Sequence, residues 1–173
     1  YPSLYLKGNW GGGFFYRSPY TAMGLDGKLM VSLGASDDLI VYDPATDSVE
    51  QISAKSDLIK SIKPWSMFKG LVPSSEKETV WYKANASYQN IVCDPWKNCY
   101  YRFFSLPAEN TSGDKPLGII IFDSNMKKLG ECLVKCDMRL DSTCFFVSED
   151  GLYIRVVSSS EDELEFACFD VYD

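Results

Sequence analysis

The side chains best suited to contact a ligand lie in one short segment, at Trp96, Tyr100 and Arg102. Alternate residues of an extended strand point to the same side, so Tyr100 and Arg102 would share a face, with Tyr101 on the other. A guanidinium fork beside aromatic rings could hold an anion or a sugar. The alternative is structural, with Arg102 paired to a carboxylate of a neighbouring sheet. We therefore predict Arg102, Tyr100 and Trp96 as binding residues and keep the structural alternative open.

The residues needed for the common catalytic and metal sites are missing. The chain has no histidine, which excludes Ser/His/Asp and Cys/His sets and removes the commonest general base. Gly11-Gly12-Gly13 lacks the flanking pattern of a phosphate-binding loop, so we expect a flexible turn there. The sequence predicts no catalytic residue, no metal site and no cofactor.

Six cysteines are spread over the second half of the chain, at Cys93, Cys99, Cys132, Cys136, Cys144 and Cys168. They do not form the paired CxxC motifs of a zinc site. Most stand in apolar, strand-like runs, which favours small buried hydrophobic residues. The alternative is a disulfide between Cys93 and Cys99 across a hairpin, which would require an oxidising compartment.

Carboxylate chemistry is conceivable at two acidic clusters. The first contains Asp37-Asp38, Asp43 and Asp47, and the second contains residues 161–163 and Glu165. A pair of such groups could hydrolyse a glycan. The alternative is that turn aspartates bond their own backbone and that acidic runs are solvated. Neither cluster has the spacing of a calcium loop.

Composition points to an all-β domain of acidic character. The 173 residues are 46% hydrophobic and 14% aromatic, and aromatic residues favour strands. The formal net charge is −7, and there is no run of Lys or Arg. Nucleic acid and anionic membrane surfaces are therefore improbable partners. No run reaches the length of a membrane span.

Short strands separated by turn residues recur along the chain. We predict three groups of strands, at 19–52, 88–135 and 143–173, with an insertion at 53–87 that contains helical turns near 57–62 and 75–82. Each group contains an apolar strand that ends in an aromatic residue and Asp, at Asp43, Asp123 and Asp170. The second and third copies are 47 residues apart, which is typical of a four-stranded propeller blade. The sequence thus predicts about three blades of an antiparallel β-propeller.

The hairpin at 90–102 resembles a known family. Its Asp94-Pro95, Asn98 and Tyr100-Tyr101-Arg102 are similar to a motif of uncharacterised TolB-like, six-bladed β-propeller proteins, often lipoproteins, of Bacteroides-type gut bacteria. Cys93 stands where that motif has Tyr. The resemblance implies half of a six-bladed ring, and a periplasmic or outer-membrane-anchored location. It implies no activity, because the family has none established.

Together these features favour a non-catalytic binding or scaffolding propeller for a protein, peptide or glycan ligand. The alternative is a carboxylate-based glycan hydrolase or lyase. Three blades do not close a ring, so we expect the rest of a propeller or a second copy to complete it. In that case residues 1–6 would form a strand of an adjoining blade.

Overall fold

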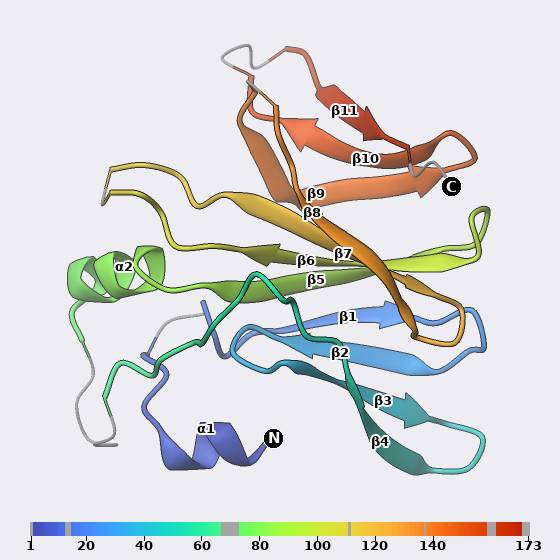
Figure 1. Ribbon diagram of the computed structural model, residues 1–173, viewed down its shortest axis with the longest axis horizontal. Helices are drawn as coiled ribbons and strands as arrows, with labels where there is room; N and C mark the ends of the chain where they lie inside the picture. The colour runs from blue at the N-terminus through green and yellow to red at the C-terminus, as the bar shows by residue number, and fades with distance from the viewer. Residues whose placement is uncertain are drawn as a thin grey trace.

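Three antiparallel sheets follow one another along the chain and stack face to face (Figure 1). The computed structural model describes residues 2–12, 15–66, 73–110, 112–136, 138–158 and 162–170. The first sheet contains β1 (Pro19–Met23), β2 (Leu29–Leu33), β3 (Asp38–Asp43) and β4 (Ser48–Ser53). The second contains β5 (Ser87–Asp94), β6 (Cys99–Ser105), β7 (Leu117–Asp123) and β8 (Lys128–Leu133). The third contains β9 (Leu140–Ser148), β10 (Gly151–Val156) and β11 (Glu165–Phe169). The all-β, antiparallel prediction is confirmed.

Each sheet is a meander in which consecutive strands pair. The strand orders are β1-β2-β3-β4, β5-β6-β7-β8 and β9-β10-β11. The first strands of the sheets lie together, because β5 is in contact with both β1 and β9. The middle sheet is covered on both faces, and every residue of β6 is buried.

Aspartates close the turns that join neighbouring strands. Asp43, Asp94 and Asp123 each end a strand and accept the backbone N–H two residues further on, at 2.8, 3.0 and 2.9 Å. These are the turns that an Asx side chain stabilises by replacing a backbone acceptor. The structural interpretation of Asp43 is therefore confirmed.

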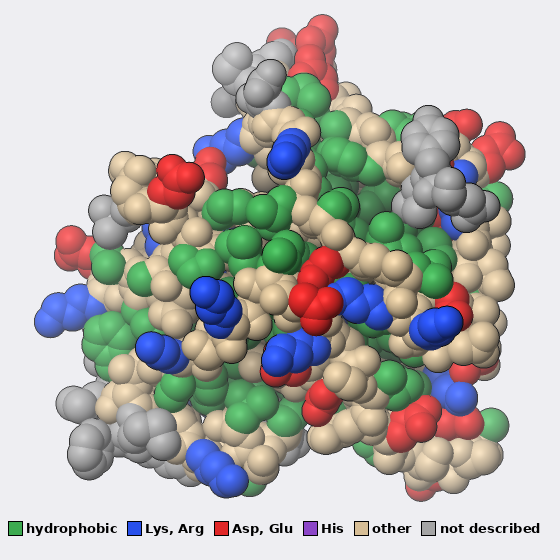
Figure 2. All heavy atoms as spheres, viewed as in Figure 1, with side chains coloured by type: hydrophobic (Ala, Val, Ile, Leu, Met, Phe, Trp, Pro, Cys, Tyr) green, Lys and Arg blue, Asp and Glu red, His purple; other side chains and the backbone are tan. Residues whose placement is uncertain are grey.

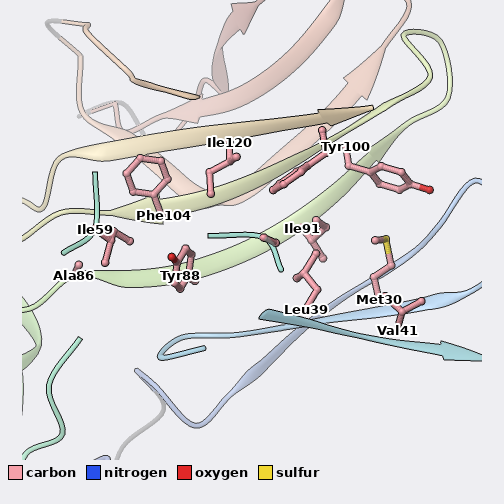
Figure 3. Packing of buried hydrophobic residues seen from close by; sticks show 12 residues of the cluster. Met30, Leu39, Val41, Ile59, Ala86, Tyr88, Ile91, Tyr100, Phe104 and Ile120 are labelled. Atoms are coloured by element: carbon pink, nitrogen blue, oxygen red, sulfur yellow. The ribbon is translucent and has the colours of Figure 1, made fainter. Parts of the chain in front are cut away.

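Two hydrophobic clusters hold the three sheets together. The first lies between the first and second sheets, where Leu39 faces Ile91 and Met30 faces Tyr100 (Figure 3). The second lies between the second and third sheets, where Phe103 of β6 packs edge-on against Phe145 of β9, with centroids 5.2 Å apart. The three sheets are thus joined by two hydrophobic layers, with β5 to β8 between them.

One of the two expected helical segments differs from the structure. Residues 57–62 are not helical, because Asp57 and Leu58 bond to Glu131 and Ser56 and Ile59 is buried in the first cluster. These tertiary contacts replace the hydrogen bonds of a helical turn. The expected helix near 75–82 is confirmed as α2 (Ser75–Lys83).

The prediction that residues 1–6 form a strand is wrong. Residues Ser3–Lys7 form the short helix α1. The Tyr5 hydroxyl donates to the carbonyl of Tyr16 at 2.7 Å and accepts from the N–H of Ala35 at 3.0 Å. The ring of Tyr5 also packs on Trp10, with centroids 5.5 Å apart. An aromatic cluster beside the first sheet therefore holds this segment.

The third sheet carries aromatic side chains on the face directed away from the second sheet. Phe145 and its neighbours on alternate positions face the second cluster, so Phe146 points the other way. Phe146 stacks on Tyr153 of β10 at 4.7 Å and contacts Phe166 of β11 at 5.1 Å. Phe146 is 45% exposed. This aromatic face (Phe146, Tyr153 and Phe166) has the composition of a surface that is normally covered.

Candidate functional site

Arg102 is fully buried between the first two sheets. Its guanidinium donates to Ser32 Oγ at 3.1 Å and to the carbonyl oxygens of Ser36, Asp37 and Ala54 at 2.8 to 2.9 Å. The carbon at its centre lies 3.9 Å from the centroid of the Tyr88 ring. Its exposed fraction is zero. Arg102 therefore joins two sheets, as in the structural alternative, although carbonyl oxygens take the place of the expected carboxylate.

The other two predicted binding residues do not form an accessible site with Arg102. Tyr100 is buried, and its hydroxyl accepts the N–H of Leu25 at 2.9 Å. Trp96 lies on the turn between β5 and β6 and is 55% exposed. The structure thus separates Trp96, which solvent reaches, from Tyr100 and Arg102, which solvent does not reach.

The acidic clusters and the cysteines also have defined places. Asp37 accepts the hydroxyl of Tyr88 at 2.7 Å, and burial raises the pKa of that phenol above its ordinary value. Of the second acidic cluster, Asp162, Glu163 and Glu165 are exposed, and Glu161 lies outside the described residues. All six cysteines are free, so the disulfide alternative is wrong. The expectation that most of them are buried is also wrong, because only Cys99 is buried and solvent reaches the other five at least in part. No group of three metal-ligating side chains occurs in the described ranges.

A pocket lined by several polar and charged side chains opens where the first strands of the second and third sheets begin. Its volume is about 270 Å³. The walls come from α2, the starts of β5 and β9, and the connection between β6 and β7. It is lined by Phe15, Thr79, Tyr82, Lys83, Gln89, Ser105, Asp114, Lys115, Leu117, Arg139, Leu140 and Ser142. We call this the Lys115 pocket.

The ammonium of Lys115 lies against neutral groups of this pocket. Its ammonium donates to the carbonyl of Tyr82 at 3.2 Å and to Ser87 Oγ at 2.9 Å. The same nitrogen lies 3.7 Å from the centroid of the Tyr82 ring, and Phe15 stacks on that ring at 4.2 Å. Burial lowers the pKa of Lys115 to about 7, because the charged form loses water.

A chain of hydrogen bonds runs from Lys115 across to the third sheet. Ser87 Oγ lies 3.1 Å from Ser105 Oγ, which accepts from Gln89 Nε2 at 3.0 Å. Ser142 of β9 donates to Gln89 Oε1 at 2.6 Å. Strands β5, β6 and β9 therefore fix this polar row in place before any ligand arrives.

The pocket carries more positive than negative charge. Lys83, Lys115 and Arg139 line it, against the single carboxylate of Asp114. Asp114 pairs with Arg139 at 2.9 Å, and both side chains are more than half exposed. A basic pocket is notable on a chain whose formal net charge is −7.

Sequence reasoning missed this site because its members share no local pattern. Lys115 and Ser87 are 28 residues apart, and Gln89 and Ser142 are 53 residues apart. Lys115 follows a polar turn and precedes Pro116, which is typical of a solvated loop. Only the stacking of sheets places these residues together.

A second hollow, of about 360 Å³, lies between the second and third sheets (Figure 2). Its walls are mainly hydrophobic and include Ile119, Ile121, Leu152 and Phe169. It offers few groups that could orient a polar ligand, so it is a weaker candidate than the Lys115 pocket. Within the described ranges, no helix is long and apolar enough to cross a bilayer.

The fold belongs to a class of mostly β proteins built from successive antiparallel sheets, and one family within it matches the sequence. The profile of the family described as Domain of unknown function (DUF4221) matches residues 1–133, so the chain belongs to this family. The prediction that the chain belongs to a family of unknown function is therefore confirmed.

A solved structure shares the fold. It is described as the crystal structure of a member of the duf4221 family from Bacteroides vulgatus ATCC 8482. The TM-score is 0.73 at 22% sequence identity, over 92% of this chain and 46% of the other. This chain therefore spans about half the length of that protein. A search of curated proteins gave no match.

Proposed function

We propose that the three sheets are blades of a six-bladed β-propeller. Three features support this proposal: each complete sheet is a four-stranded meander, the sheets stack face to face, and β5 lies beside β1 and β9 as inner strands would. The related Bacteroides chain is about twice as long, which leaves room for as many blades again. The remaining blades would come from further chain or from a second copy.

Within this architecture we infer that the protein is a non-catalytic binding domain, with the Lys115 pocket as its site. The observation that carries the inference is the polar row from Lys115 to Ser142, which three strands and two sheets hold in position. Loops and strand ends around a propeller axis are where such folds bind ligands. The ligand would be a protein, a peptide or a glycan.

Binding can be tested by NMR, with a panel of neutral monosaccharides, sugar acids and dipeptides as probes. We expect at least one probe class to give saturable shifts at the side-chain amide of Gln89 and the backbone amide of Ser142. The variant Gln89→Ala should lose this response. Gln51→Ala, on the exposed strand β4 of the first sheet, is the matched control and should keep it.

Two outcomes would contradict the proposal. One is a panel in which every saturable shift lies outside the Lys115 pocket. The other is release of new reducing ends from a glycan at a rate that depends on the protein, which would favour the carboxylate-based hydrolase or lyase.

We further propose a periplasmic or outer-membrane-anchored location. The support is the resemblance of the hairpin at 90–102 to lipoproteins of Bacteroides-type bacteria. Fractionation of cells that express the full-length gene product tests this location, and recovery in the cytoplasmic fraction would contradict it.

A further inference from the structure

We propose that the Lys115 pocket binds a sugar acid, with the sugar's carboxylate on the ammonium of Lys115 and its hydroxyls on Gln89 and Ser142. This inference rests on the proposed binding function and adds the chemical class of the ligand. It combines three observations: an ammonium without a partner of opposite charge, a row of polar groups with unused hydrogen-bonding capacity, and a small, basic cavity.

The ammonium of Lys115 has no carboxylate partner among the described residues. Both of its acceptors, the carbonyl of Tyr82 and Ser87 Oγ, are neutral. The nearest carboxylate in sequence, Asp114, pairs instead with Arg139 at 2.9 Å. Lys115 is partly buried, and a charge that has lost much of its water is normally paired. A ligand that supplies the missing anion would satisfy this rule.

The polar row has donors left over. An ammonium has three N–H groups, and Lys115 donates to two acceptors in the described structure. The Gln89 amide nitrogen has two, and one of them reaches Ser105. Hydroxyl groups both donate and accept, so a ring with several hydroxyls matches an amide beside serines better than an apolar ligand does.

The size and charge of the cavity narrow the class further. A volume of about 270 Å³ lies at the small end for ligand pockets, which favours one sugar unit over a long peptide. The charged and titratable groups around Lys115 are Tyr82, Lys83, Asp114 and Arg139. Of these, Lys83 and Arg139 are cations at neutral pH and Asp114 is an anion, so the groups around Lys115 also favour an anionic ligand.

A carboxylate on Lys115 would also stabilise its protonated form. Burial lowers the pKa of Lys115 to about 7 in the free protein, so ligand binding near neutral pH would take up a proton. Above the free pKa, the affinity should then fall by about tenfold for each pH unit.

The test compares sodium glucuronate with glucose, N-acetylglutamate and sodium sulfate as NMR probes of the wild-type protein. We expect saturable shifts at Lys115, Gln89 and Ser142 with glucuronate, and much weaker shifts with the other three. Lys115→Met should weaken glucuronate binding by at least about tenfold, because a charge-assisted hydrogen bond is lost. Lys127→Met, on an exposed turn at the far end of β7, is the matched control.

A direct measurement on the wild type avoids dependence on a variant's folding. The side-chain carbon resonance of Lys115 should titrate near neutral pH in the free protein and at higher pH with glucuronate bound. An unchanged titration in saturating glucuronate would overturn the proposal.

The remaining outcomes separate the two levels of inference. Glucose binding in the pocket as tightly as glucuronate would overturn the role of the carboxylate and leave the proposed binding function standing. Tighter binding of N-acetylglutamate or sulfate would overturn the sugar acid in favour of a peptide carboxylate or an inorganic anion. Saturable shifts with a neutral probe alone would likewise overturn the role of the carboxylate and leave the proposed binding function standing.

Discussion

The guanidinium of Arg102 connects the second sheet to three carbonyl groups of the first sheet and of the segment that follows it. Replacement by Lys keeps the charge but not the planar fork, so some carbonyls and the ammonium would lose partners. We expect Arg102→Lys to lower the free energy of unfolding by about 3 kcal/mol, and Arg102→Met by a similar amount. Denaturant-induced unfolding measures both.

Arg17→Lys is the matched control for this prediction, because Arg17 is exposed. Its effect should stay within about 0.5 kcal/mol. If Arg102→Lys is as mild as Arg17→Lys, the network around Arg102 does not contribute to stability as described.

At the residue scale, Lys115 also predicts how the free energy of unfolding depends on pH. Its folded pKa of about 7 lies below the ordinary lysine value of 10.5. Between these values the unfolded chain holds a proton that the folded chain has released, so stability rises with pH. Relative to Lys115→Met, the wild type should gain up to about 1 kcal/mol of unfolding free energy for each pH unit above 7.5.

Parallel unfolding curves at pH 6.5 and 9 check this gain, with Lys127→Met as the control. Both hydrogen bonds of Lys115 survive deprotonation, because a neutral amine still has two N–H groups. A wild-type stability that changes with pH in the same way as that of Lys115→Met would show that the amine has an ordinary pKa.

At the scale of single elements, the pairing of β6 with β7 depends on Gly118. Gly118 lies directly opposite Phe104, and a Cβ atom there would be 2.2 Å from Cζ of that ring. The ring is fully buried in the first cluster and has little room to move. We expect Gly118→Ala to destabilise the protein by about 2 kcal/mol.

Gly130 of β8 is the natural comparison for Gly118. A Cβ atom at Gly130 meets no atom within 4 Å. Gly130→Ala should therefore be neutral or raise stability by about 0.5 kcal/mol, because the unfolded chain loses freedom. Equal thermal midpoints for the two alanine variants would contradict the close contact at Phe104.

At the scale of the whole molecule, the two faces of β9 report whether the third sheet is covered on its outer side, as the proposed propeller requires. Phe145 packs on Phe103 in the second cluster, whereas Phe146 is 45% exposed. In the 173-residue chain alone, Phe145→Ser should cost about 3 kcal/mol and Phe146→Ser less than about 1 kcal/mol.

The same pair behaves differently if the aromatic face is covered in a completed ring. In a longer protein or a dimer that supplies the remaining blades, Phe146→Ser should then be nearly as costly as Phe145→Ser. Thermal unfolding of both proteins gives the comparison. A Phe146→Ser variant that remains mild in the longer protein, and in any dimer of this chain, would show that no blade packs on this face.

Local sequence patterns determined the class of fold and much of the strand layout. The alternation of apolar and polar residues can be recognised within a single strand. The aspartates that end β3, β5 and β7 accept the N–H only two residues further on, so these turns are also visible in the local sequence. Helix α2 was also predictable, because its residues lie between loop-forming segments. The family resemblance of the hairpin at 90–102 came from the same local motif.

The tertiary structure decided what the local patterns could not. It made residues 3–7 helical, with Tyr5 bonded to Tyr16, and kept residues 57–62 out of a helix, with Asp57 bonded to Glu131. It also buried Arg102, although its sequence context was compatible with a binding residue as well. The Lys115 pocket arises only when β5, β6 and β9 stack, because its hydrogen bonds join groups up to 53 residues apart. Strand alternation tells which residues share a face, whereas stacking of the sheets decides which face is closed and which pocket stays open.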